Sequence, residues 1–114
     1  MTPALILCIG AVAIDNDTMR CANLGPSIRL AAIDAPEQPG HCRKARRCTP
    51  GDPYAAQAEL QRLLARGPVT CRAVDTDRYG RIVAFCAARG VQISCAMVAS
   101  GHAVERYRRL EGCR

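Results

Sequence analysis

The stretch Ile28-Arg29-Leu30-Ala31-Ala32-Ile33-Asp34-Ala35-Pro36-Glu37 decides the fold, because it predicts both a strand and a bend. Its apolar residues predict a strand over residues 27–33, which Pro36 ends. Strict alternation along a strand would place Arg29 and Asp34, five residues apart, on opposite faces. A site that uses both side chains therefore requires a bend or bulge between them.

Two other motifs, Ile14-Asp15-Asn16-Asp17-Thr18 and Asp77-Arg78-Tyr79-Gly80-Arg81, carry further carboxylates and arginines. The first is typical of a tight turn in which Asn16 can take a left-handed conformation, and the second presents Arg81 where a loop meets a strand. Each motif alone is also explained by an ordinary hairpin turn. Together, the three stretches supply carboxylates, which hold hard cations or activate water, and guanidinium groups, which bind phosphate. This combination points to phosphodiester hydrolysis.

The rest of the chain predicts a mainly-β fold with two helices. An apolar run over residues 4–14 predicts a strand buried on both faces, and residues 18–22 predict its hairpin partner. Asp52-Pro53 is typical of a helix start, and a helix to about Arg66 would bury Ala56, Leu60, Leu63 and Leu64. Strands over residues 69–74 and 82–87 follow, then a short helix over residues 94–99. This order predicts one domain, residues 1–114, with a five-stranded OB-fold Greek-key barrel, a helix between strands 3 and 4 and a short helix after strand 5.

The charge of the chain favours a polyanionic partner. The formal net charge is +6, and fifteen of the sixteen basic residues are Arg, which a GC-rich genome explains equally well. A loop over residues 38–52 carries four basic side chains, Arg43, Lys44, Arg46 and Arg47. We expect this basic cluster to follow a nucleic-acid backbone, and the alternative is a solvated loop. No apolar run reaches the about 20 residues of a membrane span, so we expect no membrane partner. We also expect a monomer.

Eight cysteines in 114 residues indicate a disulfide framework and an oxidising compartment. Cys42 and Cys48 lie close enough in sequence to form a local bridge. Cys71 and Cys86 lie in apolar stretches, where a buried thiol and a bridge fit equally well. The cysteines favour a secreted or periplasmic protein whose signal peptide is not in this chain. A complete chain would be cytoplasmic, because residues 1–7 lack a basic segment and a cleavage site.

The three motifs, together with Met97-Val98-Ala99-Ser100-Gly101-His102-Ala103, resemble the thermonuclease family of staphylococcal nuclease-like OB-fold domains. The resemblance covers roughly residues 5–107, in the family's order and near its spacing. It implies a Ca²⁺-dependent nuclease that hydrolyses DNA and RNA at the 5′ O–P bond and leaves 3′-phosphate ends. The same resemblance makes Asp17, Asp34 and the Ala35 carbonyl the Ca²⁺ ligands, with Asp15 supporting them.

The catalytic roles also follow from the resemblance. Glu37 would be the general base that activates the attacking water. Arg29 and Arg81 would bind the scissile phosphate and stabilise its developing charge. Tyr79 and Tyr107 are substrate contacts by stacking or hydrogen bonding, or else packing residues.

The sequence departs from the family pattern at a few places. Asn16 stands where the family usually has Gly, and Ala35 replaces the commoner Thr. The third, C-terminal helix of the best-known member is absent or vestigial, the tail from Glu105 is expected to fray at its end, and the cysteines are expected to compensate in stability. Two alternatives remain: an inactive OB-fold module that binds nucleic acid or protein, and a disulfide-stapled secreted binding module with incidental acidic turns.

Overall fold

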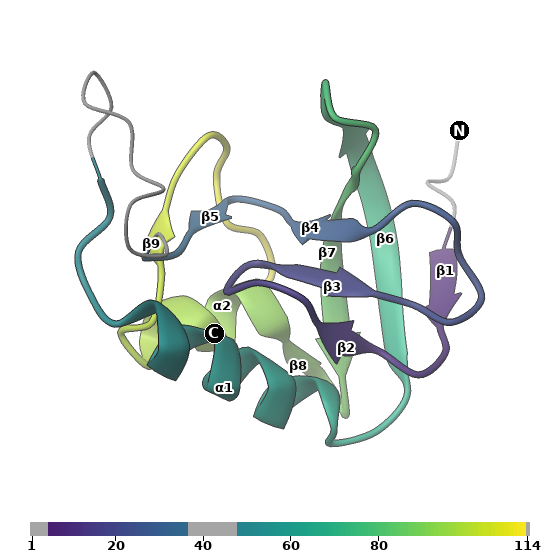
Figure 1. Ribbon diagram of the computed structural model, residues 1–114, viewed down its shortest axis with the longest axis horizontal. Coiled ribbons are helices and arrows are strands. Elements are labelled where there is room, and N and C mark those ends of the chain that lie inside the picture. Colours follow the sequence, from purple (N-terminus) through teal and green to yellow (C-terminus); the bar gives the residue numbers. More distant parts are fainter. Residues whose placement is uncertain (1–4, 37–47, 114) are drawn as a thin grey trace.

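The computed structural model describes residues 5–36 and 48–113, which form a mainly-β fold with two helices and a curled sheet (Figure 1). The strands are β1 (Leu5–Cys8), β2 (Val12–Ala13), β3 (Thr18–Arg20), β4 (Ile28–Leu30), β5 (Ile33–Asp34), β6 (Val69–Thr76), β7 (Ile82–Ala88), β8 (Val91–Gln92) and β9 (Val104–Glu105). The helices are α1 (Pro53–Leu64) and α2 (Ile93–Ala99). The mainly-β class and the two helices are confirmed, and the five-stranded Greek-key barrel stays a prediction.

The main sheet has the order β1-β6-β7-β4-β3-β2, so its two end strands are consecutive in the chain. Gly10, with φ +61°, lies between them. The prediction of one strand over residues 4–14, buried on both faces, is therefore wrong. The chain turns at this glycine, and the side chains of Leu5 and Leu7 are more than half exposed because β1 turns them away from the core.

The predicted bend between Arg29 and Asp34 is confirmed. The strand ends at Leu30, and Ala32 takes a left-handed conformation with φ +69°. The chain then enters β5, which leaves the main sheet and pairs with β9 (Figure 1). Two hydrogen bonds hold the bend in place: Ala31 N donates to Ala84 O at 2.8 Å, and Arg106 N donates to Ala32 O at 2.8 Å.

Both helices lie on one side of the curled sheet, opposite the raised β6–β7 loop (Figure 1). Asp52 caps α1 by accepting hydrogen bonds from Tyr54 N and Ala55 N, and Pro53 occupies the first turn, as predicted. The helix ends at Leu64, two residues before the predicted end, and its four predicted apolar residues are buried. No helix in the described ranges is long and apolar enough to cross a membrane.

Three disulfides tie the described residues together: Cys8–Cys21, Cys71–Cys86 and Cys95–Cys113. Cys71 and Cys86 are direct cross-strand neighbours in β6 and β7, so the open choice between thiol and bridge is settled as a bridge. Cys48 is also disulfide-bonded, but its predicted partner Cys42 lies outside the described residues. Three bridges in so small a fold fit an oxidising environment.

The left-handed bend generates a stability prediction. Ala32→Gly is expected to keep or raise the free energy of unfolding, by up to about 1 kcal/mol, because Gly adopts a positive φ without a Cβ clash. The matched control Ala84→Gly, equally buried but within β7, is expected to lose about 1 kcal/mol or more. Urea unfolding measures both, and equal losses in the two variants would contradict the bend.

Candidate active site

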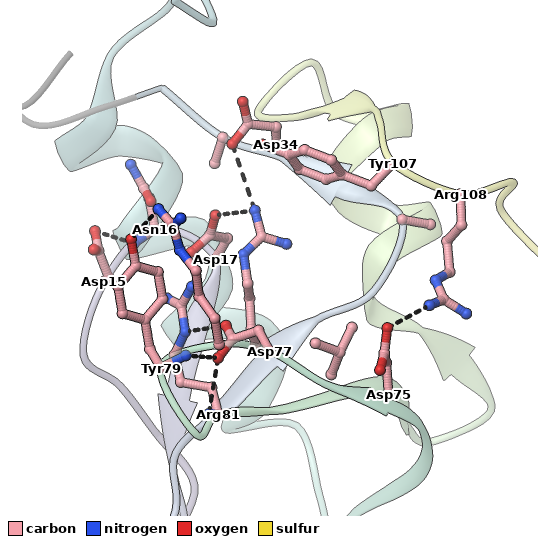
Figure 2. Close-up of a pocket in the computed structure, with 15 residues that line it drawn as sticks. Asp15, Asn16, Asp17, Asp34, Asp75, Asp77, Tyr79, Arg81, Tyr107 and Arg108 are labelled. Atoms are coloured by element: carbon pink, nitrogen blue, oxygen red, sulfur yellow. Dashed lines mark hydrogen bonds and ion pairs between the residues drawn. The ribbon is translucent and has the colours of Figure 1, made fainter. Parts of the chain in front are cut away.

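A cavity of about 480 Å³ brings the three charged motifs together (Figure 2). Eight predicted site residues line it: Asp15, Asp17, Arg29, Asp34, Ala35, Tyr79, Arg81 and Tyr107. The parallel pairing of β4 with β7 explains the meeting of the two arginines, because Ile28 lies beside Ile82 and Arg29 beside Val83. The predicted general base Glu37 and the basic cluster Arg43, Lys44, Arg46 and Arg47 lie outside the described residues.

Arg29 lies between the two aspartates that were predicted as metal ligands. Its Nη2 is 3.2 Å from Asp17 Oδ2 and 3.6 Å from Asp34 Oδ1. Its Nη1 donates to the carbonyls of Leu30 and Ile33, each at 3.2 Å, on the two sides of the bend. The bent backbone and the two carboxylates therefore fix the guanidinium group from different directions.

Asp17 is a buried carboxylate at the end of the first turn. Its Oδ1 accepts a hydrogen bond from the Thr18 hydroxyl at 2.9 Å, and its carbonyl accepts one from Leu30 N at 2.9 Å, which ties the turn to β4. Burial raises the pKa of Asp17, and the nearby Arg29 guanidinium and Thr18 hydroxyl offset only part of this rise. The charged form of this carboxylate is thus costly in the protein, and a nearby positive charge relieves that cost.

Asn16 lies in the turn of the first motif. It is absent from the residues with positive φ in the described ranges, so the turn does not use the left-handed conformation that Asn can adopt. Instead, its backbone N–H donates to Asp15 Oδ1 at 2.8 Å, and this contact shapes the turn. The Asn16 side chain is buried at the cavity, and its Nδ2 has no hydrogen-bond partner in the described part of the chain.

Asp34 is 2% exposed, and its carboxylate accepts hydrogen bonds from residues that are distant in the sequence. Its Oδ2 accepts from the Thr49 hydroxyl at 2.8 Å and from Arg106 Nη1 at 2.9 Å. Sequence reasoning missed Arg106. Its approach depends on the β5–β9 pairing, in which Asp34 is the register partner of Val104, and no local pattern signals that pairing.

Asp77 holds Arg81 in the loop between β6 and β7 (Figure 2). Its Oδ2 accepts from Arg81 Nε at 2.6 Å, and its Oδ1 accepts from the backbone N–H groups of Tyr79 and Arg81. Burial would raise the pKa of Asp77, but these hydrogen bonds outweigh it and lower the pKa. Sequence reasoning did not assign Asp77 a role, although its position two and four residues before its partners is a local signal.

Tyr79 and Tyr107 flank the arginines at the cavity. The Arg81 guanidinium lies 5.4 Å from the centre of the Tyr79 ring, and the Arg29 guanidinium lies 5.3 Å from that of Tyr107. Both rings are more than 60% exposed, so they are accessible at the surface.

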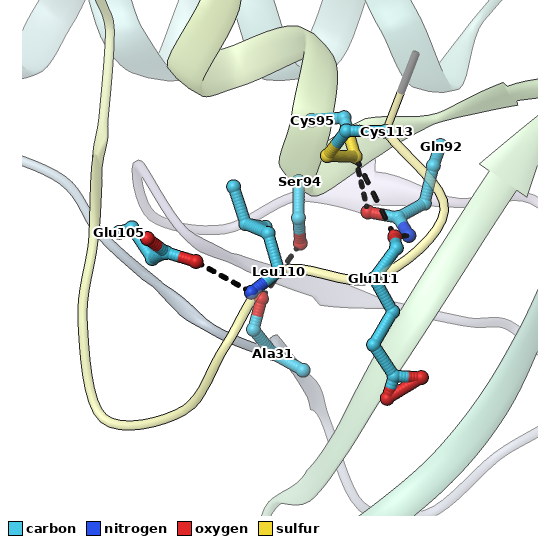
Figure 3. Close-up of a disulfide and its surroundings, with 8 residues drawn as sticks. All are labelled: Ala31, Gln92, Ser94, Cys95, Glu105, Leu110, Glu111 and Cys113. Atoms are coloured by element: carbon cyan, nitrogen blue, oxygen red, sulfur yellow. Dashed lines mark hydrogen bonds between the residues drawn. A yellow bond between two sulfur atoms is a disulfide. The ribbon is translucent and has the colours of Figure 1, made fainter.

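Tyr107 belongs to the C-terminal segment, residues 104–113. Figure 3 shows contacts of this segment at Glu105, Leu110, Glu111 and Cys113. Leu110 N donates to Glu105 Oε2 at 2.6 Å, Glu111 O accepts from the Gln92 side chain, and Cys113 is bonded to Cys95 in α2. The fraying predicted for the end of this tail concerns Arg114, which lies outside the described residues. Up to Cys113 the tail is held by the disulfide to α2 and by the hydrogen bond of Glu111 with Gln92 of β8.

The described residues do not provide a complete metal site. Among residues 5–36 and 48–113, no three His, Cys, Asp or Glu side chains are grouped to hold a metal ion. Asp17 and Asp34 do converge on a single positive group, the Arg29 guanidinium. Their donors are carboxylate oxygens, which are the ligand type that hard divalent cations prefer.

The curled β-sheet with two helices is compatible with an OB-like fold, and arginines and carboxylates line its cavity. The sequence model of the family described as "Staphylococcal nuclease homologue" matches residues 27–112, and the chain belongs to this family. Family membership indicates a nuclease-type hydrolase that binds nucleic acid. The family model does not cover the first motif, Ile14–Thr18. The link between this motif and the rest of the cavity is the ion pair of Asp17 with Arg29. No curated protein matches the chain.

The raised pKa of Asp17 generates a pH-dependent prediction. Because the pKa is raised in the folded state, stability is lost as the pH rises from the ordinary value of 3.8 through the folded pKa. Asp17→Asn is therefore expected to increase the free energy of unfolding at pH 7. Below about pH 4 the gain disappears, because Asp17 is then protonated in both states.

Urea unfolding of the variant and the unchanged protein at pH 3 and pH 7 measures this difference. Asp75→Asn is the matched control, because Asp75 also lines the cavity but its side chain is 59% exposed. We expect a change within about 0.5 kcal/mol for this control. A loss of stability in Asp17→Asn at pH 7 is the opposite of the expected result.

The anchored tail generates a second prediction. Replacing Cys95 and Cys113 by Ser is expected to cost about 3 kcal/mol of stability and to speed hydrogen exchange at the amides of residues 104–113. Replacing Cys8 and Cys21 by Ser is the control, since their sequence separation of 13 is similar to the 18 of Cys95–Cys113. The control should lower stability without a selective effect on the tail, and unchanged tail exchange in the first variant would contradict the anchoring role.

Proposed function

We propose that this protein is a Ca²⁺-dependent nuclease that hydrolyses phosphodiester bonds of DNA and RNA. The observation that carries this proposal is the placement of Arg29 and Arg81 at one cavity with the converging carboxylates of Asp17 and Asp34. Membership of the staphylococcal nuclease homologue family supports the reaction class. The net charge of +6 supports a polyanionic substrate.

In this proposal Asp17, Asp34 and the Ala35 carbonyl hold Ca²⁺, with Asp15 beside them. Hard oxygen donors fit this cation, and the burial of both carboxylates favours a positive charge between them. A cation held by these residues would supply positive charge that neutralises and orients a phosphate group. All four residues line the cavity, and so do Arg29 and Arg81.

The arginines act on the phosphate. Arg29 is fixed by two backbone carbonyls, so its fork is preorganised, and Asp77 orients Arg81 in the same way from the loop. Both guanidinium groups stabilise charge on the phosphate oxygens as water attacks. Tyr79 and Tyr107 lie beside these groups and offer exposed rings for stacking against bases.

Glu37 acts as the general base in this proposal, and cleavage at the 5′ O–P bond leaves 3′-phosphate ends. It follows Asp34 by three residues, just beyond the described part of the chain. The basic cluster of residues 43–47 binds the backbone of the nucleic acid. These assignments rest on the family resemblance of the sequence.

A second candidate is an OB-like module that binds nucleic acid without cleaving it. The arginine-carboxylate pairs favour this alternative, because Arg29 and Arg81 both engage protein carboxylates. Salt-sensitive binding of an oligonucleotide with no cleavage in Ca²⁺ at alkaline pH would support it.

The nuclease proposal predicts Ca²⁺-dependent digestion of single-stranded DNA that a chelator abolishes. Glu37→Gln and Arg81→Ala are each expected to lower kcat/KM at least about 100-fold, because each removes a group that acts in the transition state. Arg62→Ala is the matched control, since Arg62 pairs with Glu59 on the exposed face of α1, away from the cavity. We expect its activity to stay within about twofold of the unchanged protein.

End-group analysis of the products tests the cleavage position, with 3′-phosphate expected. Digestion that is independent of Ca²⁺, or undiminished in both variants, would overturn the proposal. A folded protein that binds but does not cleave would leave the binding module as the function.

A further inference from the structure

Within residues 5–36 and 48–113, two arginines form ion pairs with Asp34. Arg29 Nη2 lies 3.6 Å from its Oδ1, and Arg106 Nη1 lies 2.9 Å from its Oδ2. The Thr49 hydroxyl donates to the same Oδ2 at 2.8 Å. The Asp34 side chain is 3% exposed, so these contacts form in a protected environment where charge interactions are strong.

Among the described residues, ion pairs link four charged groups, Asp17, Asp34, Arg29 and Arg106, and we call this set the Asp34 cluster. It contains two carboxylates and two guanidinium groups, linked by ion pairs of 3.2, 3.6 and 2.9 Å. Converging carboxylates normally require a bound cation to offset their repulsion. Here the arginines already supply that positive charge.

The two arginines of the Asp34 cluster are held differently. Arg29 lies within β4, its side chain is 13% exposed, and two carbonyls fix its Nη1. Arg106 follows β9, and its side chain is 27% exposed. Its backbone N–H donates to Ala32 O, so the main chain is fixed at the bend while Nη1 of the guanidinium group contacts Asp34.

We propose that Arg106 is an internal counter-ion of Asp34 and that its pairing with this carboxylate weakens the binding of a divalent cation there. The inference rests on the proposed Ca²⁺ site. A cation that binds Asp34 must displace the guanidinium group or tolerate a positive charge within hydrogen-bond distance of its ligand. Both requirements lower its affinity. Arg106 is thus a positioning residue that acts through Asp34 and sets the Ca²⁺ concentration at which the site is filled.

Calorimetric titration with Ca²⁺, without nucleic acid, tests this role directly. Arg106→Gln removes the charge and is expected to bind Ca²⁺ about tenfold more tightly than the unchanged protein. Arg106→Lys keeps the charge and is expected to stay near the unchanged affinity. Arg72→Gln is the matched control, because it removes the same charge from a residue that pairs with Glu111 of the C-terminal segment but does not line the cavity.

Thermal unfolding with and without Ca²⁺ gives a second readout. Because a ligand stabilises the folded state according to its affinity, Ca²⁺ should raise the midpoint more in Arg106→Gln than in the unchanged protein. This comparison holds even where the variant has a lower midpoint without Ca²⁺. It therefore separates the loss of an ion pair from a change in cation affinity.

The outcomes are distinguishable. Tighter binding in Arg106→Gln alone supports the inference. Equal or weaker binding in Arg106→Gln, in a set where the unchanged protein binds Ca²⁺, overturns the inference and leaves the proposed Ca²⁺ site intact. Absence of Ca²⁺ binding in all four proteins overturns the proposed Ca²⁺ site, and the inference with it.

Discussion

The Arg29 guanidinium is the group on which the arrangement of the site depends. Its Nη1 donates hydrogen bonds to the carbonyls on both sides of the bend, and its Nη2 pairs with Asp17 and Asp34. The bend itself requires the left-handed backbone at Ala32, since a straight strand would point Arg29 and Asp34 to opposite faces. Backbone conformation, ion pairing and the shape of the cavity are therefore consequences of the same short segment.

Sequence reasoning predicted the features that depend on local chemistry. The Asp52 cap, the buried face of α1 and the need for a bend before Asp34 follow from residue types and spacing. It failed at features set by distant contacts. Residues 4–14 look buried by composition, yet Gly10 divides them and β1 lies at the end of the sheet order, which leaves Leu5 and Leu7 exposed.

The C-terminal segment shows most clearly why a single sequence is insufficient at the site. Its basic residues suggest a solvated tail, but the β5–β9 pairing and the Cys95–Cys113 bridge bring Arg106 to Asp34 and Tyr107 to the cavity. Neither a register nor a disulfide partner can be read from local spacing, because both are fixed by the path of the whole chain. The bridge also gives the segment an anchor at a position where the chain has no further helix in the described residues.

The ion pairs at the cavity constrain how a phosphate can enter. Arg29 and Arg81 line the cavity and are each paired with a carboxylate, at 3.2 and 2.6 Å respectively. A phosphate that binds these groups therefore exchanges one anion for another and does not neutralise an unpaired charge. Such an exchange gains little from simple attraction, so it favours a ligand that engages several guanidinium groups at once. Separating the carboxylates from the arginines costs less free energy when a cation binds the carboxylates in place of the guanidinium groups. Cation and phosphate are then expected to bind with positive cooperativity, because each compensates the charge that the other leaves unpaired.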